Sequence, residues 1–344
     1  MKVNSTKPDH SINDLPAGVC PFQKSDWKPA DYRQLKNKEH KRALREKGYF
    51  VVENFFNSST ITELKDLYHS LEHVGVNELG MFVSAYSPDI EYRKTVHKKI
   101  GDLVEPELNS IFESFKPILY NFVLKESRPG KTLPLHQDHA MLDEETTSSI
   151  NIWIPLMNVH PDSGTLCIVP KTQYFFPPFR SRFNELDISD VEEDLGQYRK
   201  EMHLNLGDLL VFDSRLIHGS LPNTSGKDRV AAMCHICPAD AQFQMLSRSN
   251  DQPENEFVVI EFEREDLFQA KGYESANKSE FPGTVTGKVT LGRTEIDSAQ
   301  LHDYFRSVGM TRSMPVTATP TPKSEKATSD NGLMKWVRKV IGRS

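Results

Sequence analysis

Short apolar segments, separated by turn-forming residues, fill the chain between about residues 120 and 238 and limit the folds it can adopt. The predicted strands cover residues 120–127, 148–159, 164–170, 201–206, 209–217 and 229–237. Many short strands of this kind favour a double-sheet jelly roll of the cupin type. The expected fold class is therefore mainly β with flanking helices, an α+β arrangement around a jelly-roll core at about 120–238.

The residues before this core have a helical pattern. A charged helix is predicted at about 29–47, followed by a strand over 49–56. A second helix begins at the capping-box pattern of residues 60–63, and a third covers about 92–115, with a break at Pro106. Helices that precede a β core in this way fit packing on one side of it.

Length and charge exclude some classes of protein. The chain has 344 residues, is 37% hydrophobic and carries a formal charge of −6. This is enough for one large domain, which we expect over 29–310 after a polar tail at 1–28. The mildly acidic balance argues against nucleic-acid binding. The tail has no secretory apolar segment and no run reaches about 18 apolar residues, so we expect a cytoplasmic protein.

The C-terminal end of the sequence carries a separate signal. Residues 311–331 are rich in Pro, Thr and Ser and predict a flexible linker. Residues 332–344 (GLMKWVRKVIGRS) then predict a short amphipathic helix with Trp336 on its apolar face and only basic charges on the other. This pattern is typical of helices that lie on a membrane surface, so we expect peripheral membrane contact. Docking onto the protein's own body or onto a partner is the alternative.

His136, Asp138 and the distant His218 have the pattern of a metal site. Residues i and i+2 of an extended strand point to the same face, so His136 and Asp138 can reach one ion while Gln137 points away. Two imidazoles and one carboxylate leave three metal positions open, as non-haem Fe(II) oxygenases require. Because no thiolate is among the ligands, a structural zinc site is disfavoured.

A second His-x-Asp sequence, His160-Pro161-Asp162, competes for the same interpretation. It is followed by Ser163 and Gly164 and lies between two apolar segments. Proline fixes φ, aspartate bonds its own backbone and glycine takes a positive φ, so this segment predicts a turn rather than a metal site.

Cys234 and Cys237 form a C-x-x-C sequence inside an apolar stretch that starts at Val230. Alternate residues of such a stretch face opposite sides of a sheet. We therefore interpret it as a buried strand, with redox or metal chemistry as the alternative.

Arg229 lies eleven residues after His218 and suits a dicarboxylate co-substrate, because a guanidinium pairs bidentately with a carboxylate. Ala231 shares its strand face and leaves space for a ligand. In the predicted strand at 148–159, Asn151 and Trp153 share a face that can line a cavity, while the alternating isoleucines face the helices. Core packing is the alternative for Trp153.

The segment from Tyr174 to Arg182 (YFFPPFRSR) is aromatic and rich in proline. It predicts a lid or wall of the substrate site, in which Arg180 or Arg182 meets an anionic group. A proline-stiffened surface loop is an equally good interpretation.

Over about residues 49–238 the sequence resembles the phytanoyl-CoA dioxygenase family of Fe(II)/2-oxoglutarate-dependent oxygenases. The resemblance is densest in three blocks: Pro134-Leu135-His136-Gln137-Asp138; Ile152 to Leu156 through Ser163-Gly164-Thr165-Leu166 to Val169-Pro170-Lys171-Thr172; and Leu206-Gly207-Asp208-Leu209 through Phe212 and His218-Gly219-Ser220 to Asn223 and Arg229. It implies a double-stranded β-helix fold, which agrees with the strand pattern.

By this resemblance His136, Asp138 and His218 are the catalytic residues that bind Fe(II). Arg229 binds the distal carboxylate of 2-oxoglutarate, Ser220 assists it, and Trp153 lies near this co-substrate. The implied reaction uses O₂ and 2-oxoglutarate, releases succinate, and hydroxylates a small organic or lipid-like substrate. A related halogenase has a small residue in place of the carboxylate, so Asp138 argues against halogenation.

Two alternatives remain at this point. The first is an iron oxygenase that does not use 2-oxoglutarate, in which Arg229 binds a substrate anion directly. The second is a catalytically silent jelly-roll module that binds a small ligand and is tethered by its C-terminal helix. Three polar ligands converging in a core are costly without a metal, which argues against the second alternative.

Overall fold

The structure is a computed structural model. It describes residues 31–312 except for gaps at 72, 74, 145, 176–179, 181–187, 249–252, 254, 270–280 and 292–295. The predicted N-terminal tail, linker and C-terminal amphipathic helix therefore lie almost entirely outside the described residues. Among the residues described, no helix is both long enough and apolar enough to cross a bilayer.

Two antiparallel sheets form the jelly roll. The larger has the strand order β1-β8-β5-β10-β3-β2 and the smaller has the order β4-β9-β6-β7. The strands of the larger sheet are β1 (Tyr49–Val52), β8 (Leu209–Asp213), β5 (Ile150–Pro155), β10 (Arg229–Pro238), β3 (Phe115–Lys125) and β2 (Met81–Val83). Those of the smaller sheet are β4 (Leu133–His136), β9 (His218–Ser220), β6 (Leu166–Ile168) and β7 (Lys200–Glu201). The predicted fold class, mainly β with flanking helices around a jelly roll, is confirmed.

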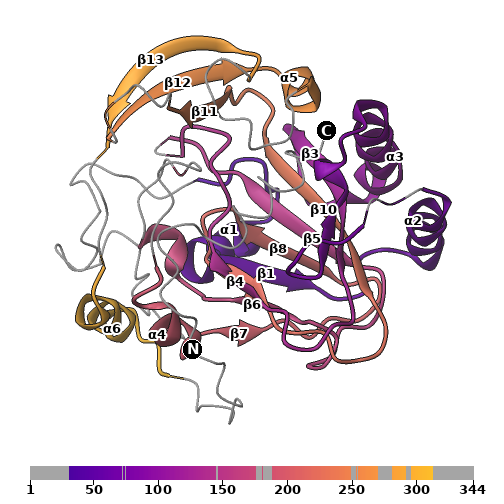
Figure 1. The fold of residues 1–344 in the computed structure, drawn as a ribbon, viewed down its shortest axis with the longest axis horizontal. Coiled ribbons are helices and arrows are strands. Elements are labelled where there is room, and N and C mark those ends of the chain that lie inside the picture. The colour runs from indigo at the N-terminus through magenta and orange to yellow at the C-terminus, as the bar shows by residue number, and fades with distance from the viewer. Residues whose placement is uncertain are drawn as a thin grey trace, which may run out of the picture.

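Helices cover the outer face of the larger sheet. Figure 1 places α2 (Ser58–Ser70) and α3 (Ile90–Leu108) beside the edge of the sheet that contains β3. The helix predicted at 29–47 is shorter than expected, because α1 (Lys38–Lys47) begins where the Asn37 side chain accepts a hydrogen bond from the Glu39 backbone N–H. The helix predicted at 92–115 ends at Leu108, two residues after Pro106.

The strands of the larger sheet present one face to the helices and the other to the interior of the jelly roll. Ile150, Ile152 and Ile154 pack into the same apolar cluster as residues of α2 and α3. Asn151 and Trp153 point to the opposite face and line a cavity. The predicted alternation of β5 is therefore confirmed, and Trp153 both packs in the core and lines the cavity.

The C-x-x-C sequence lies in β10, as the apolar pattern predicts. Cys234 belongs to the cluster under the helices, whereas Cys237 belongs to another cluster at the end of the strand. Burial raises the pKa of Cys237 to about 12, although the charge of nearby Lys116 acts in the opposite direction. Two buried thiols that face different clusters are structural residues.

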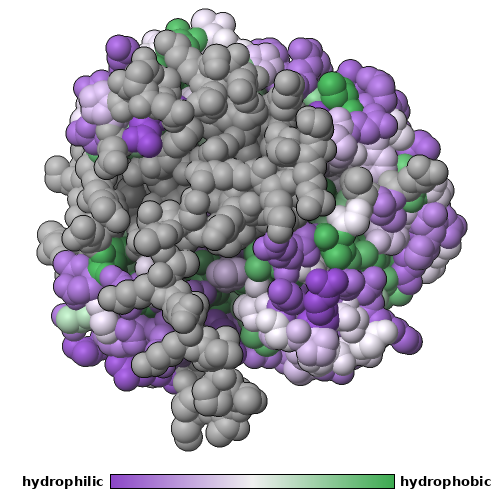
Figure 2. All heavy atoms as spheres, in the orientation of Figure 1, coloured by the Kyte–Doolittle hydropathy of each residue, from purple (hydrophilic) through white to green (hydrophobic). Residues whose placement is uncertain are grey.

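The remaining elements lie around the jelly roll. They are a three-stranded sheet of β11 (Phe243–Ser247), β12 (Glu256–Phe262) and β13 (Thr284–Thr290), the helices α4 (Glu192–Gly196), α5 (Arg264–Gln269) and α6 (Ser298–Ser307), and the 3-10 turns η2 (Ser84–Tyr86) and η3 (Thr172–Tyr174). Polar residues dominate the described surface in Figure 2, with apolar residues in small separate groups. The large apolar side chains exposed among the described residues are Ile90, Leu206 and Val285.

Candidate active site

Two neighbouring strands of the smaller sheet bring three potential metal ligands together. His136 ends β4 and His218 begins β9, and the two residues are partners in the antiparallel register. Asp138 follows two residues after β4, and its Oδ1 lies 3.8 Å from the Nε2 atoms of both histidines. One ligand atom from each of the three residues lies within 4.8 Å of the others, so the set can hold one metal ion.

Gly219, between His218 and Ser220, permits this close approach of β9 to β4. A Cβ atom at Gly219 would lie 2.7 Å from the carbonyl oxygen of Leu133, closer than packed atoms allow. Glycine at this position therefore keeps the two histidines on adjacent backbones.

Backbone carbonyls fix the orientation of both imidazoles. His136 Nδ1 lies 2.8 Å from the carbonyl oxygen of Pro134, and His218 Nδ1 lies 3.0 Å from that of Leu216. A carbonyl oxygen only accepts, so each Nδ1 carries the hydrogen and each Nε2 has a free lone pair. Those Nε2 atoms face Asp138, which is the arrangement that metal-binding histidines adopt.

The charges of the three side chains also suit a divalent cation. Burial, together with the charge of His218, lowers the pKa of His136 to about 4. Burial alone raises the pKa of Asp138, but His218, His136 and a hydrogen bond from Asn151 outweigh it and lower that pKa to about 2. At neutral pH the carboxylate is ionised and His136 is neutral, as metal binding requires.

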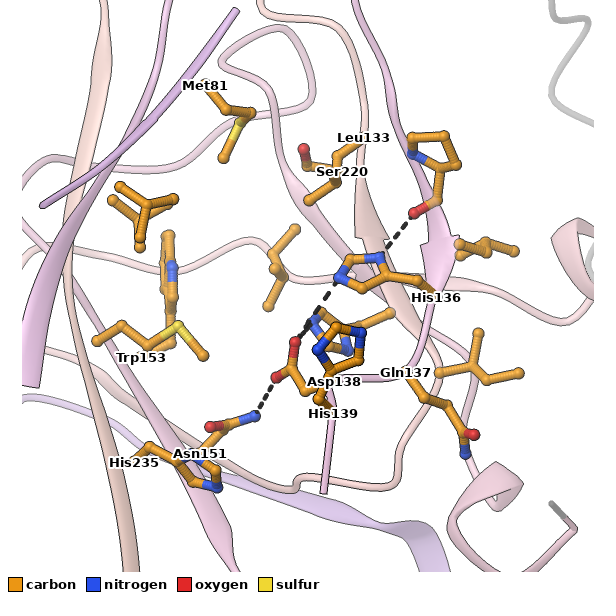
Figure 3. A pocket seen from close by; sticks show the side chains of 18 of the residues that line it. Met81, Leu133, His136, Gln137, Asp138, His139, Asn151, Trp153, Ser220 and His235 are labelled. Atoms are coloured by element: carbon orange, nitrogen blue, oxygen red, sulfur yellow. Dashed lines mark hydrogen bonds and ion pairs between the residues drawn. The ribbon is translucent and has the colours of Figure 1, made fainter. Parts of the chain in front are cut away.

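Figure 3 shows His136 and Asp138 turned toward each other and Gln137 pointing away from both. The Gln137 amide donates a hydrogen bond to the carbonyl oxygen of Arg215 instead. Asn151 lies on the far side of Asp138, and its Nδ2 donates to Asp138 Oδ2 over 2.8 Å.

The three residues border a cavity of about 340 Å³ that is lined by strands of both sheets. Arg229 of β10 and Ser220 of β9 also line it, as does Trp153 of β5. The structure thus places the residues predicted to bind iron and 2-oxoglutarate around one cavity. Much of the remaining wall is apolar, from Met81, Val83, Leu119, Val123, Met141 and Met233.

Arg229 and Ser220 have polar atoms without partners within the described structure. Arg229 is 1% exposed and donates from Nη1 to the carbonyl oxygen of Gly164, while its Nε has no acceptor. The Ser220 hydroxyl is buried and also unpaired. Burial lowers the pKa of Arg229 to about 10, which leaves it charged at neutral pH. Unpaired buried donors cost free energy, so these atoms suit an anionic ligand such as a carboxylate.

The guanidinium carbon of Arg229 lies 5.2 Å from the ring centroid of Trp153. This cation–π contact holds the arginine against one wall of the cavity.

Arg180, one of two arginines considered for an anionic ligand, lines the cavity, and its charge has a partner within the protein while its Nη2 is buried without a hydrogen-bond partner among the described residues. Both Arg180 and Glu144 are buried, and they form an ion pair. Arg180 Nε also donates to the carbonyl oxygen of Asp138 over 2.8 Å. Arg180 therefore supports the backbone of a predicted metal ligand, which sequence spacing could not reveal because its partners Asp138 and Glu144 are 42 and 36 residues away. Arg182 lies outside the described residues.

His160 lies away from the cavity. Its side chain is exposed, and its carbonyl oxygen accepts a hydrogen bond from the backbone N–H of Ser163 over 3.0 Å. The predicted turn is confirmed, and the second His-x-Asp sequence is not part of the site.

Comparison with known proteins agrees with this geometry. The family described as phytanoyl-CoA dioxygenase (PhyH) matches residues 44–231, more than half of the chain. The peroxisomal phytanoyl-CoA dioxygenase of Bos taurus is 24% identical over 256 residues, which cover 64% of this chain and 75% of the relative. The Homo sapiens protein of the same name is 23% identical over 258 residues, with 64% and 75% covered.

Solved structures show a more distant likeness. HygX from Streptomyces hygroscopicus, solved with nickel, 2-oxoglutarate and hygromycin B, is 15% identical with a TM-score of 0.46, covering 63% of this chain and 92% of HygX. The carbocyclase SnoK from nogalamycin biosynthesis is 21% identical with a TM-score of 0.42, covering 60% and 86%.

A jelly roll with two histidines and one carboxylate on the wall of its cavity is typical of non-haem iron oxygenases. The chain belongs to the phytanoyl-CoA dioxygenase family, a family of Fe(II)/2-oxoglutarate-dependent oxygenases, as the sequence motifs predict.

Proposed function

We propose that the protein is a dioxygenase that couples decarboxylation of 2-oxoglutarate to hydroxylation of a small organic or lipid-like substrate. The observation that carries this function is the convergence of His136, Asp138 and His218 within 4.8 Å beside a cavity. These residues hold Fe(II), and the bound iron supplies the activation of O₂ when 2-oxoglutarate is present.

Arg229 and Ser220 bind the distal carboxylate of 2-oxoglutarate. Their unpaired buried donors on the wall of the same cavity support this role. A bound dicarboxylate would accept hydrogen bonds from the guanidinium and from the serine hydroxyl, which would remove the cost of leaving these donors unpaired. The protein's contribution is to orient the co-substrate and to exclude bulk water from the site.

Hydroxylation is favoured over halogenation because Asp138 is an intact carboxylate held in place by Asn151. The apolar wall formed by residues such as Met81, Leu119 and Met233 supports a substrate with apolar surface.

The test is conversion of 2-oxoglutarate to succinate by the Fe(II)-loaded protein, comparing wild type with His136→Ala and His160→Ala. The two variants remove a histidine from the same His-x-Asp spacing, but only His136 borders the cavity. We expect succinate release, including slow release without substrate, to persist in His160→Ala and to disappear in His136→Ala. Loss of turnover in His160→Ala alone would refute the assignment. Iron binding without any succinate from the wild type would point to an oxygenase that does not use 2-oxoglutarate.

Membrane contact through residues 332–344 stays a prediction, since this segment lies outside the described residues. Deleting it and measuring partition of the protein onto anionic liposomes tests the prediction. Unchanged partition would remove the membrane interpretation and favour docking onto a protein surface.

A further inference from the structure

A second group of polar side chains lines the cavity, far along β10 from Arg229. His235 lies on the same face of β10 as Arg229, because alternate residues of a strand share a face and the two are six positions apart (235 − 229). At about 3.3 Å per residue, their Cα atoms are about 20 Å apart. Both residues line the cavity, so the end that holds Arg229 and the end that holds His235 are separate parts of it.

His235 lies beside Asn151 in the larger sheet. It is the register partner of Asn151 on β5 and of Leu119 on β3. Directly paired residues of antiparallel strands point to the same face, and all three residues line the cavity. Figure 3 shows His235 next to Asn151, on the side of Asp138 that faces away from His136. The two polar side chains are therefore close to the metal ligands but outside the set that binds the ion.

Both side chains keep hydrogen-bonding atoms that the described residues do not use. Asn151 donates to Asp138, and an ionised carboxylate only accepts, so the amide orientation is fixed and Asn151 Oδ1 is left as a buried acceptor without a partner. Nε2 of His235 is also buried and unpaired. The His235 residue is partly exposed, and because it lies on the inner face of the sheet, its exposed part faces the cavity.

Arg180 adds a donor to this end of the cavity but no unmatched charge. It lines the cavity, and its Nε donates to the carbonyl oxygen of Asp138 over 2.8 Å. Its Nη2 is buried without a hydrogen-bond partner among the described residues, while Glu144 matches its charge. Burial lowers the pKa of His235, so its imidazole is neutral at neutral pH and has one donor and one acceptor nitrogen.

This combination fits a neutral polar group better than an anion. A carboxylate only accepts, so it would leave Asn151 Oδ1 unpaired and place a negative charge beside it. A hydroxyl or an amide both donates and accepts, and so can pair with Asn151 Oδ1 and with a donor of His235 or Arg180. Leu119 and Met233, which adjoin His235 on the same face, provide apolar wall for the rest of such a molecule.

We propose, on the basis of the function proposed above, that Asn151, Arg180 and His235 form a polar subsite that binds a hydroxyl or amide group of an otherwise apolar substrate. Binding of that group beside Asp138 orients the carbon chain of the substrate near the metal ligands. The alternative is that ordered water molecules satisfy the same three side chains and that no substrate group binds there.

The experiment measures binding of two probes to the Fe(II)- and 2-oxoglutarate-loaded protein by anaerobic equilibrium dialysis. The probes are octan-1-ol and 1-fluorooctane, which have the same carbon chain and nearly the same size, but fluorine cannot donate a hydrogen bond and accepts only weakly. The variants are His235→Leu and His235→Phe, which both remove the polar atoms of the ring. Affinity for 2-oxoglutarate is measured first on every protein.

His40→Leu is the matched control. His40 is also partly exposed and has a buried, unpaired ring nitrogen, but it stacks on Phe50 and does not line the cavity.

We expect wild type to prefer octan-1-ol, and both His235 variants to bind it about 3- to 10-fold more weakly, the usual contribution of one hydrogen bond. Binding of 1-fluorooctane and of 2-oxoglutarate stays unchanged, and the His40 variant behaves as wild type.

Three results would overturn the subsite: no preference for octan-1-ol in wild type, including binding of neither probe; an unchanged preference in the His235 variants; or an equal loss for both probes. Failure of the wild type to bind 2-oxoglutarate at all would instead refute the proposed function, and the subsite with it.

Discussion

Asn151 binds one oxygen of the Asp138 carboxylate, and the other oxygen faces the two histidines. Asn151 Nδ2 donates to Asp138 Oδ2 over 2.8 Å, while Oδ1 lies 3.8 Å from the Nε2 atoms of both His136 and His218. The amide therefore fixes the rotation of the carboxylate and leaves the second oxygen for a metal ion. Because Asn151 belongs to β5, the larger sheet orients a ligand that follows a strand of the smaller one.

We predict that Asn151→Leu binds Fe(II) about 10- to 100-fold more weakly than wild type, the usual effect of removing a hydrogen bond to a metal ligand. Asn121→Leu is the control, because Asn121 also lines the cavity but donates its amide to a backbone carbonyl. Competition with a metal chelator gives both affinities. Equal affinities in the Asn151 variant and wild type would show that Asp138 does not need this bond.

Arg229→Ala is predicted to raise the KM for 2-oxoglutarate strongly and to leave iron content unchanged. Truncating one partner of a buried charge pair costs about 2–5 kcal/mol, which corresponds to between about 30-fold and several thousand-fold in affinity. Arg128→Ala, which removes a half-exposed arginine paired with Glu126, is the control and should leave KM unchanged. An unchanged KM in Arg229→Ala would remove this arginine from the co-substrate site.

The buried pair of Arg180 and Glu144 gives a prediction about stability. Glu144→Gln leaves the arginine charge buried without a carboxylate, so we expect the free energy of unfolding to fall by about 3–5 kcal/mol. Asp240→Asn is the comparison, because Asp240 pairs with Arg33 at the surface and such pairs contribute about 0–1 kcal/mol. Urea unfolding of the metal-free proteins measures both effects. Similar losses in the two variants would mean that Arg180 is hydrated in solution.

His97 of α3 gives a prediction about pH. Its Nδ1 accepts the backbone N–H of Tyr120 over 3.0 Å, and burial, followed by the charge of Arg264, lowers its pKa to about 4. In the unfolded chain the pKa is about 6.5, so between these values the unfolded state binds more protons. The contribution of His97, about 3 kcal/mol, is complete above about pH 6.5 and is lost as the pH falls toward 4.

His97→Asn tests this dependence, because asparagine can accept the same hydrogen bond but does not titrate. We expect the free energy of unfolding of the variant to change less between pH 6.5 and pH 4.5 than that of wild type. Identical slopes in the two proteins would show that His97 is not the group that responds.

The sequence predicts those parts of the structure whose signal is local. Period-two alternation over Ile150 to Ile154 is visible in the sequence and matches the two faces of β5. The turn at His160 follows from proline, aspartate and glycine in adjacent positions. The spacing of His136 and Asp138 is also a local signal, because residues i and i+2 of an extended backbone point to the same face in any surroundings.

The parts that the sequence does not reveal depend on distant partners or on very short elements. β2 and β9 have three residues each, too few to show any periodicity. Arg180 resembles an anion-binding residue until its buried partner Glu144 is known.

The most direct test of the central claim is an anaerobic titration of the Fe(II)-loaded protein with 2-oxoglutarate, followed by its weak visible absorption band. We predict that a band develops in wild type, and that it is absent in His218→Ala and requires far more 2-oxoglutarate in Arg229→Ala. Bound iron without any band in wild type would contradict the use of 2-oxoglutarate. The absence of bound iron would contradict the assignment of His136, Asp138 and His218 as a metal site.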